Sequence, residues 1–98
     1  MTQRTIEFEC DDEKASINRK RHSGVSFEEA ETVFDDPYAR ITDDPDHSGD
    51  EERAIIIGYS SKDRLLFVSF AARGDVIRII SARKADLSER EIYEEKHD

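Results

Sequence analysis

The sequence has one cysteine, no tryptophan, two prolines and four glycines in 98 residues. The single cysteine, Cys10, cannot form an internal disulfide, and this favours a reducing compartment such as the cytoplasm. The scarcity of proline and glycine excludes a collagen-like chain or a proline-rich linker. No apolar run approaches the roughly 20 residues that span a bilayer. Residues 1–8 lack the apolar segment of a signal peptide, so we expect a cytoplasmic protein with no membrane contact.

The sequence is rich in charged residues. Charged residues make up 40% of the chain and hydrophobic residues 36%. Three dense apolar runs nevertheless predict a folded chain rather than a disordered one. At this length the chain has room for one small domain, and we expect that domain to cover residues 1–98.

Acidic and basic residues are unevenly distributed, although the formal net charge is -9. Residues 28–52 contain eleven acidic residues and one basic residue, whereas residues 14–21 contain four basic residues and no acidic one. Residues 53–84 contain seven basic and two acidic residues. Because the local field decides where an anion binds, a nucleic-acid surface is compatible with this acidic chain. The alternative is that these are ordinary solvated charges.

Apolar periodicity predicts an α+β fold. The expected order is β-α-α-β-β-β-β-α, and it forms an antiparallel β-sheet with the helices packed on one face. Strands are predicted at about residues 5–10, 39–42, 53–60, 65–73 and 76–83, and helices at about residues 12–22, 26–36 and 88–96.

Two of the predicted helices begin with a capping-box pattern, in which the cap residue is followed three positions later by glutamate. The two pairs are Ser26 with Glu29 and Asp86 with Glu89. Asp36-Pro37 ends the earlier of these helices, because the residue before proline is pushed out of the helical region.

Gly74-Asp75 predicts a two-residue hairpin turn that pairs Arg73 with Val76. This pairing determines which side chains share a face of the hairpin. One face is nearly all apolar and is expected to receive the helices; it carries Leu66, Val68, Phe70, Ala72, Ile77, Ile79 and Ser81. The other face carries Leu65, Phe67, Ser69, Ala71, Arg73, Val76, Arg78 and Ile80.

Arg73 and Arg78 beside small residues predict a positively lined hollow above the sheet. The planar fork of a guanidinium group matches the oxygens of a phosphate, so this hollow is a candidate phosphate site. The alternative is that the two arginines solvate an open sheet face or pair with the acidic loop 43–52.

His22, Glu52 and Arg53 are further candidates. Histidine is suited to proton transfer because its ordinary pKa lies near neutral pH; the alternative for His22 is a position at a helix C-terminus favoured by the helix dipole. Glu52 and Arg53 open a strand directly after the acidic loop, and an ion pair at the strand end is the alternative there.

We expect no metal site and no cofactor. Residues 44–55 resemble a calcium loop with Gly49 at position six, but position twelve is Ile55 where a bidentate glutamate is required. The three histidines have no metal-ligand spacing, and no glycine-rich phosphate loop is present. Cys10 is interpreted as a small buried thiol.

The order and spacing of several short motifs resemble the BrnT family, the toxin half of a bacterial type II toxin–antitoxin pair. The resemblance covers nearly the whole chain. The N-terminal motif is Phe8, Asp11, Lys14, Asn18 and His22, followed by Val25-Ser26-Phe27-Glu28-Glu29-Ala30. The middle motif is Phe34-Asp35-Asp36-Pro37, then Asp46-His47-Ser48, Glu52, Arg53 and Ile57-Gly58. The C-terminal motif is Arg73-Gly74-Asp75, residues 77–85, Glu89-Arg90 and Tyr93-Glu94.

The resemblance implies a RelE-like fold and a ribonuclease that cleaves RNA, inhibits translation and is neutralised by an antitoxin called BrnA. It also implies two toxins on an antitoxin dimer, with DNA contacted only through the antitoxin. We expect metal-independent cleavage, in which the 2′-hydroxyl attacks the neighbouring phosphate. The expected catalytic residues are His22, Glu52, Arg73 and Arg78. The expected RNA-binding residues are Lys14, Arg53, Arg83 and Lys84.

Two other functions are compatible with the residues. The first alternative to an active toxin is a catalytically degenerate toxin homologue that acts as a protein-binding module, and the second is a housekeeping α+β domain whose arginines are structural. Growth arrest on expression and RNA cleavage distinguish the toxin from the binding module, and ion pairs of Arg73 and Arg78 with residues 43–52 would support the housekeeping domain.

Overall fold

The computed structural model describes residues 6–9, 24–43 and 52–95 of the chain. The elements in chain order are β1 (Glu7–Glu9), α2 (Phe27–Thr32), the 3₁₀ turn η1 (Val33–Asp35), β2 (Arg40–Asp43), β3 (Glu52–Tyr59), β4 (Leu65–Arg73), β5 (Val76–Lys84) and α3 (Leu87–Glu94). The α+β fold class is thereby confirmed, and the helix predicted at residues 12–22 lies outside the described residues. Within the described ranges, no helix is long and apolar enough to cross a membrane.

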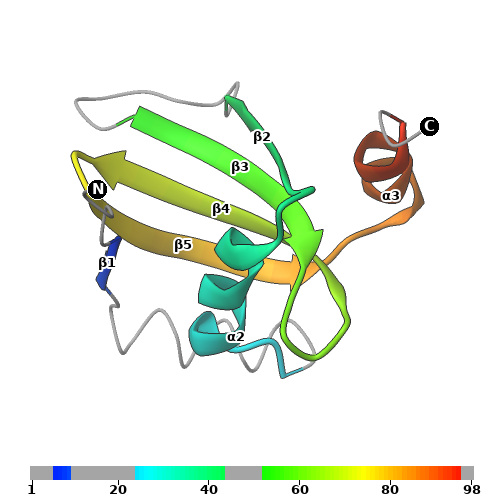
Figure 1. Ribbon diagram of the computed structural model, residues 1–98, viewed down its shortest axis with the longest axis horizontal. Coiled ribbons are helices and arrows are strands. Elements are labelled where there is room, and N and C mark those ends of the chain that lie inside the picture. The colour runs from blue at the N-terminus through cyan, green and yellow to red at the C-terminus, as the bar shows by residue number, and fades with distance from the viewer. Residues whose placement is uncertain (1–5, 10–23, 44–51, 96–98) are drawn as a thin grey trace.

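The five strands form one sheet in the order β1-β5-β4-β3-β2 (Figure 1). β1 runs parallel to β5, whereas the other neighbours are antiparallel. The prediction of a purely antiparallel sheet was therefore wrong. Alternation predicts a strand but not its direction, and β1 is placed by long-range packing: the Phe8 ring contacts the Phe34 ring at 5.4 Å between centroids.

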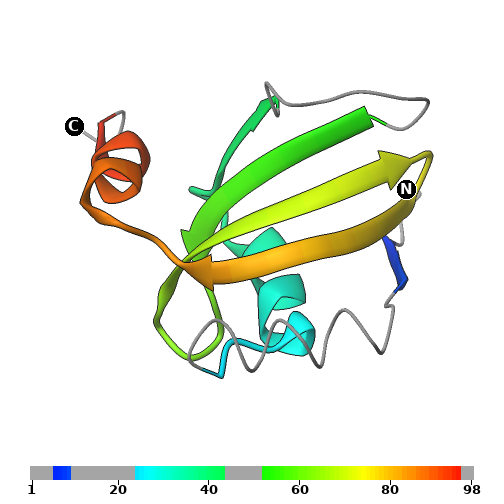
Figure 2. The same ribbon diagram turned by 180° about the vertical axis from the view of Figure 1, so that it is seen from behind.

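The main core lies between α2 with η1 and one face of the sheet, here called the inner face. Ala30 and Val33 are fully buried against Ile56, Val68 and Ile79 of the three central strands. Figure 2 shows this helix behind the sheet, with β3, β4 and β5 in front. The inner face is therefore filled by apolar side chains, and the opposite outer face is left for other contacts.

The last helix packs against the outer face, at one end of the sheet. Its Tyr93 is buried with Ile57 and Leu65, and the Tyr59 ring contacts the Tyr93 ring edge-on at 5.3 Å. The prediction that the helices share one face was therefore wrong. The physical reason is that the outer face is itself apolar at this end and needs a cover.

The predicted hairpin register is confirmed near the turn, where Arg73 pairs with Val76. Further along, Ser69 pairs with Ser81 but Phe70 pairs with Ile79, so β5 has one extra residue. Such a bulge shifts which side chains face each side. Ser81 consequently lies on the outer face and not on the apolar face as predicted, and Ala82 is buried in the core in its place.

Asp36 lies in the turn that precedes β2, and its side chain is hydrogen-bonded to both β3 and α3. One carboxylate oxygen accepts hydrogen bonds from the Tyr59 backbone N–H and the Tyr93 hydroxyl, each at 2.8 Å. Burial, together with this bond to a carboxylate, raises the pKa of Tyr93 to about 12. Gly58 allows the close approach, since a Cβ there would lie 3.0 Å from side-chain atoms of Val33 and Ala39.

The two predicted capping boxes have different outcomes. At α3 the box is complete: Asp86 accepts from the Glu89 backbone N–H at 2.9 Å, and the Glu89 carboxylate accepts from the Asp86 N–H at 2.8 Å. At α2, Ser26 accepts from the Glu29 N–H at 3.0 Å, which confirms the cap. The Glu29 carboxylate, however, bonds to the β3–β4 connection instead of returning to the cap.

Glu29 is buried and connects α2 to the sheet. Its carboxylate accepts from the Ser60 hydroxyl at 2.6 Å and from Arg64 Nε at 2.9 Å, and it also pairs with Arg64 Nη2. The Arg64 hydrogen bond, with a smaller contribution from Ser60, holds the pKa of Glu29 below its ordinary value against the opposing effect of burial. A buried carboxylate is stable only with such partners.

Glu29→Gln is expected to lower the free energy of unfolding by about 2 kcal/mol at neutral pH, because it removes a charged hydrogen-bond acceptor from Arg64. A carboxyl with a lowered folded-state pKa stabilises the fold above its ordinary pKa of 4.5, and that stability is lost as the pH falls through the folded-state pKa. The measurement is urea unfolding at a series of pH values. The variant should lack the part of the fall in unfolding free energy that Glu29 causes at acidic pH.

Glu28→Gln is the matched control, since Glu28 is exposed on the same helical turn. An equal loss of stability in the two variants would contradict the structural role of Glu29.

Candidate anion-binding site

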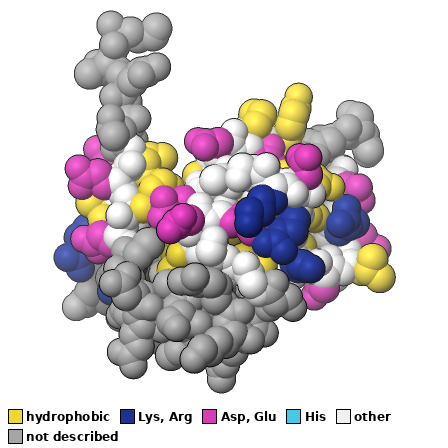
Figure 3. All heavy atoms as spheres, turned by 90° about the horizontal axis from the view of Figure 1, so that it is seen from below, with side chains coloured by type: hydrophobic (Ala, Val, Ile, Leu, Met, Phe, Trp, Pro, Cys, Tyr) yellow, Lys and Arg dark blue, Asp and Glu magenta, His cyan; other side chains and the backbone are white. Residues whose placement is uncertain are grey.

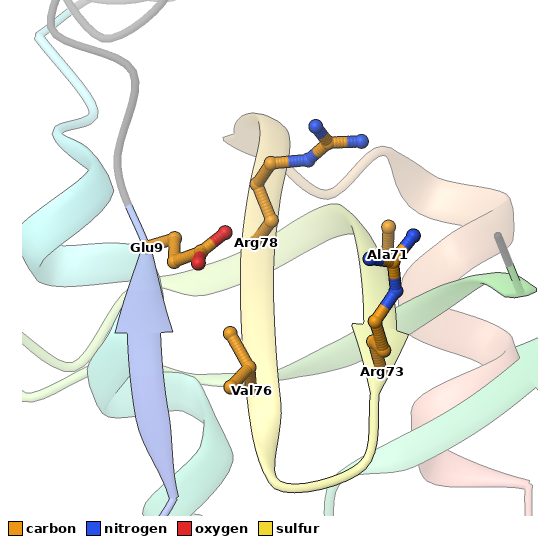
Figure 4. Close-up of a pocket in the computed structure, with 5 residues that line it drawn as sticks. All are labelled: Glu9, Ala71, Arg73, Val76 and Arg78. Atoms are coloured by element: carbon orange, nitrogen blue, oxygen red, sulfur yellow. The ribbon is translucent and has the colours of Figure 1, made fainter.

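A hollow of about 210 Å³ opens on the outer face near the β4–β5 turn (Figure 4). The residues that line it are Glu9, Ala71, Arg73, Val76 and Arg78. Four of the five come from the hairpin, and the fifth comes from β1 at the neighbouring edge. We call this the arginine hollow.

Cross-strand pairing brings these side chains together. Arg73 lies opposite Val76, and Ala71 lies opposite Arg78, so all four share one face of the hairpin. The turn itself depends on Gly74, which has φ +61° at the first turn position. Glycine adopts a positive φ at little cost, whereas most larger residues do not, so a larger residue there would strain the turn and with it the register.

The two guanidinium groups lie on the same side of the sheet. Figure 4 shows Arg73 and Arg78 both directed to the side on which Ala71 lies. Arg73 is exposed, whereas Arg78 is half-buried and its Nε is fully covered. A small floor residue between two planar cations leaves space for an anion.

Arg53 adds a third cation to this surface. It lies opposite Ala71 on β3, just as Arg78 lies opposite Ala71 on β5. Arg53 is exposed at the start of its strand. Three guanidinium side chains therefore surround one small residue, and we call Arg53, Arg73 and Arg78 the arginine triad.

Glu9 is the carboxylate that the sequence analysis missed. It pairs with Arg78 across the parallel β1–β5 edge, and Figure 4 shows its carboxylate directed toward Arg78. The alternating pattern around Phe8 predicted the strand, but only the parallel pairing brings Glu9 to the hollow. No local signal in the sequence contains that information.

The structure leaves three of the other predicted site residues undetermined. His22 and Lys14 lie outside the described residues. The backbone of Glu52 begins β3 opposite Ala72, but its side chain is not among those described. The catalytic roles predicted for His22 and Glu52 therefore stay predictions, as does RNA binding by Lys14.

Arg83, a predicted RNA-binding residue, forms an ion pair within the chain. Its Nη1 and Nη2 donate to the two carboxylate oxygens of Glu89 at 2.8 and 2.6 Å, and its guanidinium lies 4.2 Å from the centre of the Phe67 ring. The bond to Glu89 raises the pKa of Arg83 further. Since its fork is already occupied, Arg83 contributes to holding α3 on the sheet rather than to the arginine hollow.

Lys84, the fourth predicted RNA-binding residue, is exposed at the end of β5, far along the strand from the arginine hollow. Figure 3 shows that Lys and Arg side chains gather in a cluster on the face seen from below, with acidic side chains around it. The net negative charge of the chain is therefore accompanied by local basic surface.

The fold and the arginine hollow define a small α+β protein with a cationic site on an open sheet face. Residues 10–89 match the family described as the ribonuclease toxin BrnT of type II toxin–antitoxin systems, and the chain belongs to this family. None of the curated proteins matches the sequence.

A similar solved structure is the crystal structure of the Brucella abortus ribonuclease toxin BrnT. The TM-score is 0.61 at 22% sequence identity, and the alignment covers 84% of this chain and 99% of the Brucella chain. The similarity supports the fold described above.

Inorganic phosphate is expected to bind the arginine hollow and to raise the melting temperature of the protein. An anion at ten times its Kd adds about 1.4 kcal/mol to the stability, which corresponds to several degrees for a domain of this size. Arg73→Gln and Arg78→Gln should each reduce this rise in a thermal unfolding assay at fixed ionic strength.

Lys62→Gln provides the control, because Lys62 is exposed at the β3–β4 connection and does not line the hollow. If phosphate stabilises all three variants as much as the unmodified protein, the hollow is not an anion site.

Proposed function

We propose that this protein is an endoribonuclease that cleaves RNA in the arginine hollow without a metal ion. The observation that carries the proposal is the arginine triad, in which Arg53, Arg73 and Arg78 share one open sheet face around Ala71. Membership of the BrnT family supports ribonuclease activity as the function of such a site.

The reaction begins with attack of a ribose 2′-hydroxyl on the adjacent phosphorus. The bond between O2′ and phosphorus forms, the bond between phosphorus and O5′ breaks, and the products are a cyclic phosphate and a 5′-hydroxyl. Negative charge builds on the phosphate oxygens as the new bond forms. Arg73 and Arg78 stabilise that charge, a contribution of about 3 kcal/mol in comparable sites.

A base must accept the proton of the 2′-hydroxyl, and an acid must supply a proton to O5′. Glu9 is the described carboxylate that lines the hollow, and it is our candidate for the base because a positioned carboxylate can accept a proton from the attacking hydroxyl. His22 and Glu52 stay candidates for the acid from the sequence analysis. Arg53 is assigned to the RNA backbone.

The family implies a protein partner, since BrnT toxins belong to type II toxin–antitoxin systems. We propose that this partner is a BrnA-like antitoxin, that two toxins bind an antitoxin dimer, and that DNA is contacted through the antitoxin alone. The expected consequence of free toxin is inhibition of translation in the cytoplasm, through cleavage of RNA.

Purified protein is expected to cleave RNA in EDTA, and Arg78→Ala should lower kcat by about 10²–10³-fold, because it removes a positive group that faces the developing charge. The measurement is the rate of appearance of cyclic phosphate ends on a labelled RNA. Lys62→Ala is the matched control and should keep full activity.

Undiminished cleavage by Arg78→Ala would remove Arg78 from the site. Intact RNA with the unmodified protein, together with normal growth of cells that express it, would instead favour a protein-binding module.

Glu9→Gln is expected to lower kcat and to remove the acid limb of the pH–rate profile, since glutamine cannot accept the 2′-hydroxyl proton. Glu7→Gln serves as the control because Glu7 is exposed on the same short strand and does not line the hollow. A Glu9→Gln profile with the acid limb unchanged would assign the base to another residue.

A further inference from the structure

A second hollow, of about 350 Å³, lies at the other end of the sheet from the arginine hollow. It opens between the β3–β4 connection, the end of β5 and the start of α3. The residues that line it are Tyr59, Asp63, Arg64, Leu65, Lys84, Ala85 and Arg90. We call this the distal hollow.

Strand geometry places Tyr59 and Leu65 of the distal hollow on the outer face, on the side of the arginine hollow, whereas Lys84 pairs with the inner-face residue Leu66 and lies at the end of β5. Leu65 and Arg73 are eight residues apart on the uninterrupted strand β4, so their side chains point to the same side. Tyr59 lies opposite Leu65 and shares that side. At ~3.3 Å per residue the two ends of β4 are about 26 Å apart, and Figure 2 shows no described helix in front of the middle of the three central strands.

The distal hollow has an excess of positive charge. Lys84 and Arg90 are exposed, and Arg90 Nη1 donates to the Tyr59 hydroxyl at 3.2 Å, which holds this guanidinium beside an aromatic ring. Arg64 is paired with Glu29, and Asp63 is the acidic residue of the lining. Besides Arg64, the lining therefore has two exposed cations, Arg90 and, at the end of β5, Lys84, against one acidic residue.

The surface between the two hollows suits a single-stranded nucleic acid. Ser69 and Ser81 lie opposite each other on this face, and both are half-exposed. Next to them, the Arg83 guanidinium lies over the Phe67 ring and is bound by Glu89. The Arg83 side chain is nevertheless 36% exposed to solvent. Bases stack on aromatic rings and on flat guanidinium groups of this kind.

We propose that the distal hollow is a second subsite for the phosphate backbone of the RNA that is cleaved in the arginine hollow. This inference rests on the proposed function. A separation of about 26 Å corresponds to about eight nucleotides of a stacked strand at ~3.4 Å each, and to fewer in an extended strand. Basic grooves for single strands cover a similar length, about 4–16 nucleotides.

The test compares short with long strands, using the full chain and variants whose folding is checked by circular dichroism. Binding of fully 2′-deoxy oligonucleotides of about 4 and about 16 nucleotides is measured by fluorescence anisotropy over a range of salt concentrations. Cleavage is measured on the shortest RNA that the protein cuts and on the same RNA extended at both ends. The variants are Lys84→Ala and Arg90→Ala, with Lys62→Ala as the control.

We expect Lys84→Ala and Arg90→Ala each to weaken binding of the long strand several-fold and to reduce the slope of log K against log salt by about 0.7. Binding of the short strand should be unchanged, and for the long RNA the KM should rise while kcat stays constant. Lys62→Ala should match the unmodified protein in every measurement.

Equal effects on short and long strands, or equal effects of Lys62→Ala and Lys84→Ala, would overturn the subsite and leave cleavage in the arginine hollow intact. Length-dependent binding that needs Lys84 and Arg90, without cleavage of any RNA, would overturn the proposed function while supporting the distal hollow as a nucleic-acid subsite.

Discussion

The pairing of β4 with β5 is the constraint on which the site depends. A two-residue turn with glycine at positive φ sets Arg73 opposite Val76, and the regular ladder then sets Ala71 opposite Arg78. Because side chains alternate along a strand, a shift of β5 by one residue against β4 would turn Arg78 toward the apolar core and Ile77 and Ile79 out of it. The burial of the inner face therefore enforces the register that exposes the guanidinium groups on the outer face.

The arginines of the sheet and its edges divide into two groups by their contacts. Arg64 and Arg83 are each bound in a bidentate manner by a buried glutamate, Glu29 of α2 and Glu89 of α3. These two pairs attach one helix to each face of the sheet. The arginine triad lies at the other end of the sheet, where no described helix covers the outer face.

Helix placement explains why the outer face is only partly open. Tyr93 covers the apolar end around Ile57 and Leu65, where exposure would be costly, and its hydroxyl is bonded to Asp36. At the other end of the strands, the outer face carries Ser69, Ala71 and the arginine triad, for which solvent contact has no such cost. One sheet face thus combines a core surface with a charged, solvent-facing surface, because its residues change from apolar to small and basic along the strands.

Local patterns in the sequence determined the strands β3, β4 and β5, the turn at Gly74 and the cap of α3. They also determined that Arg73 and Arg78 share a face. Each of these features depends on residues close together in the chain. Tertiary structure alone decided the parallel pairing of β1, which brings Glu9 to the arginine hollow, and the bulge in β5, which moves Ser81 to the outer face. It also decided that Arg83 pairs with Glu89 and that α3 packs on the outer face. These features depend on which apolar surfaces remain uncovered after the hairpins form, and that competition between distant segments is absent from any local pattern.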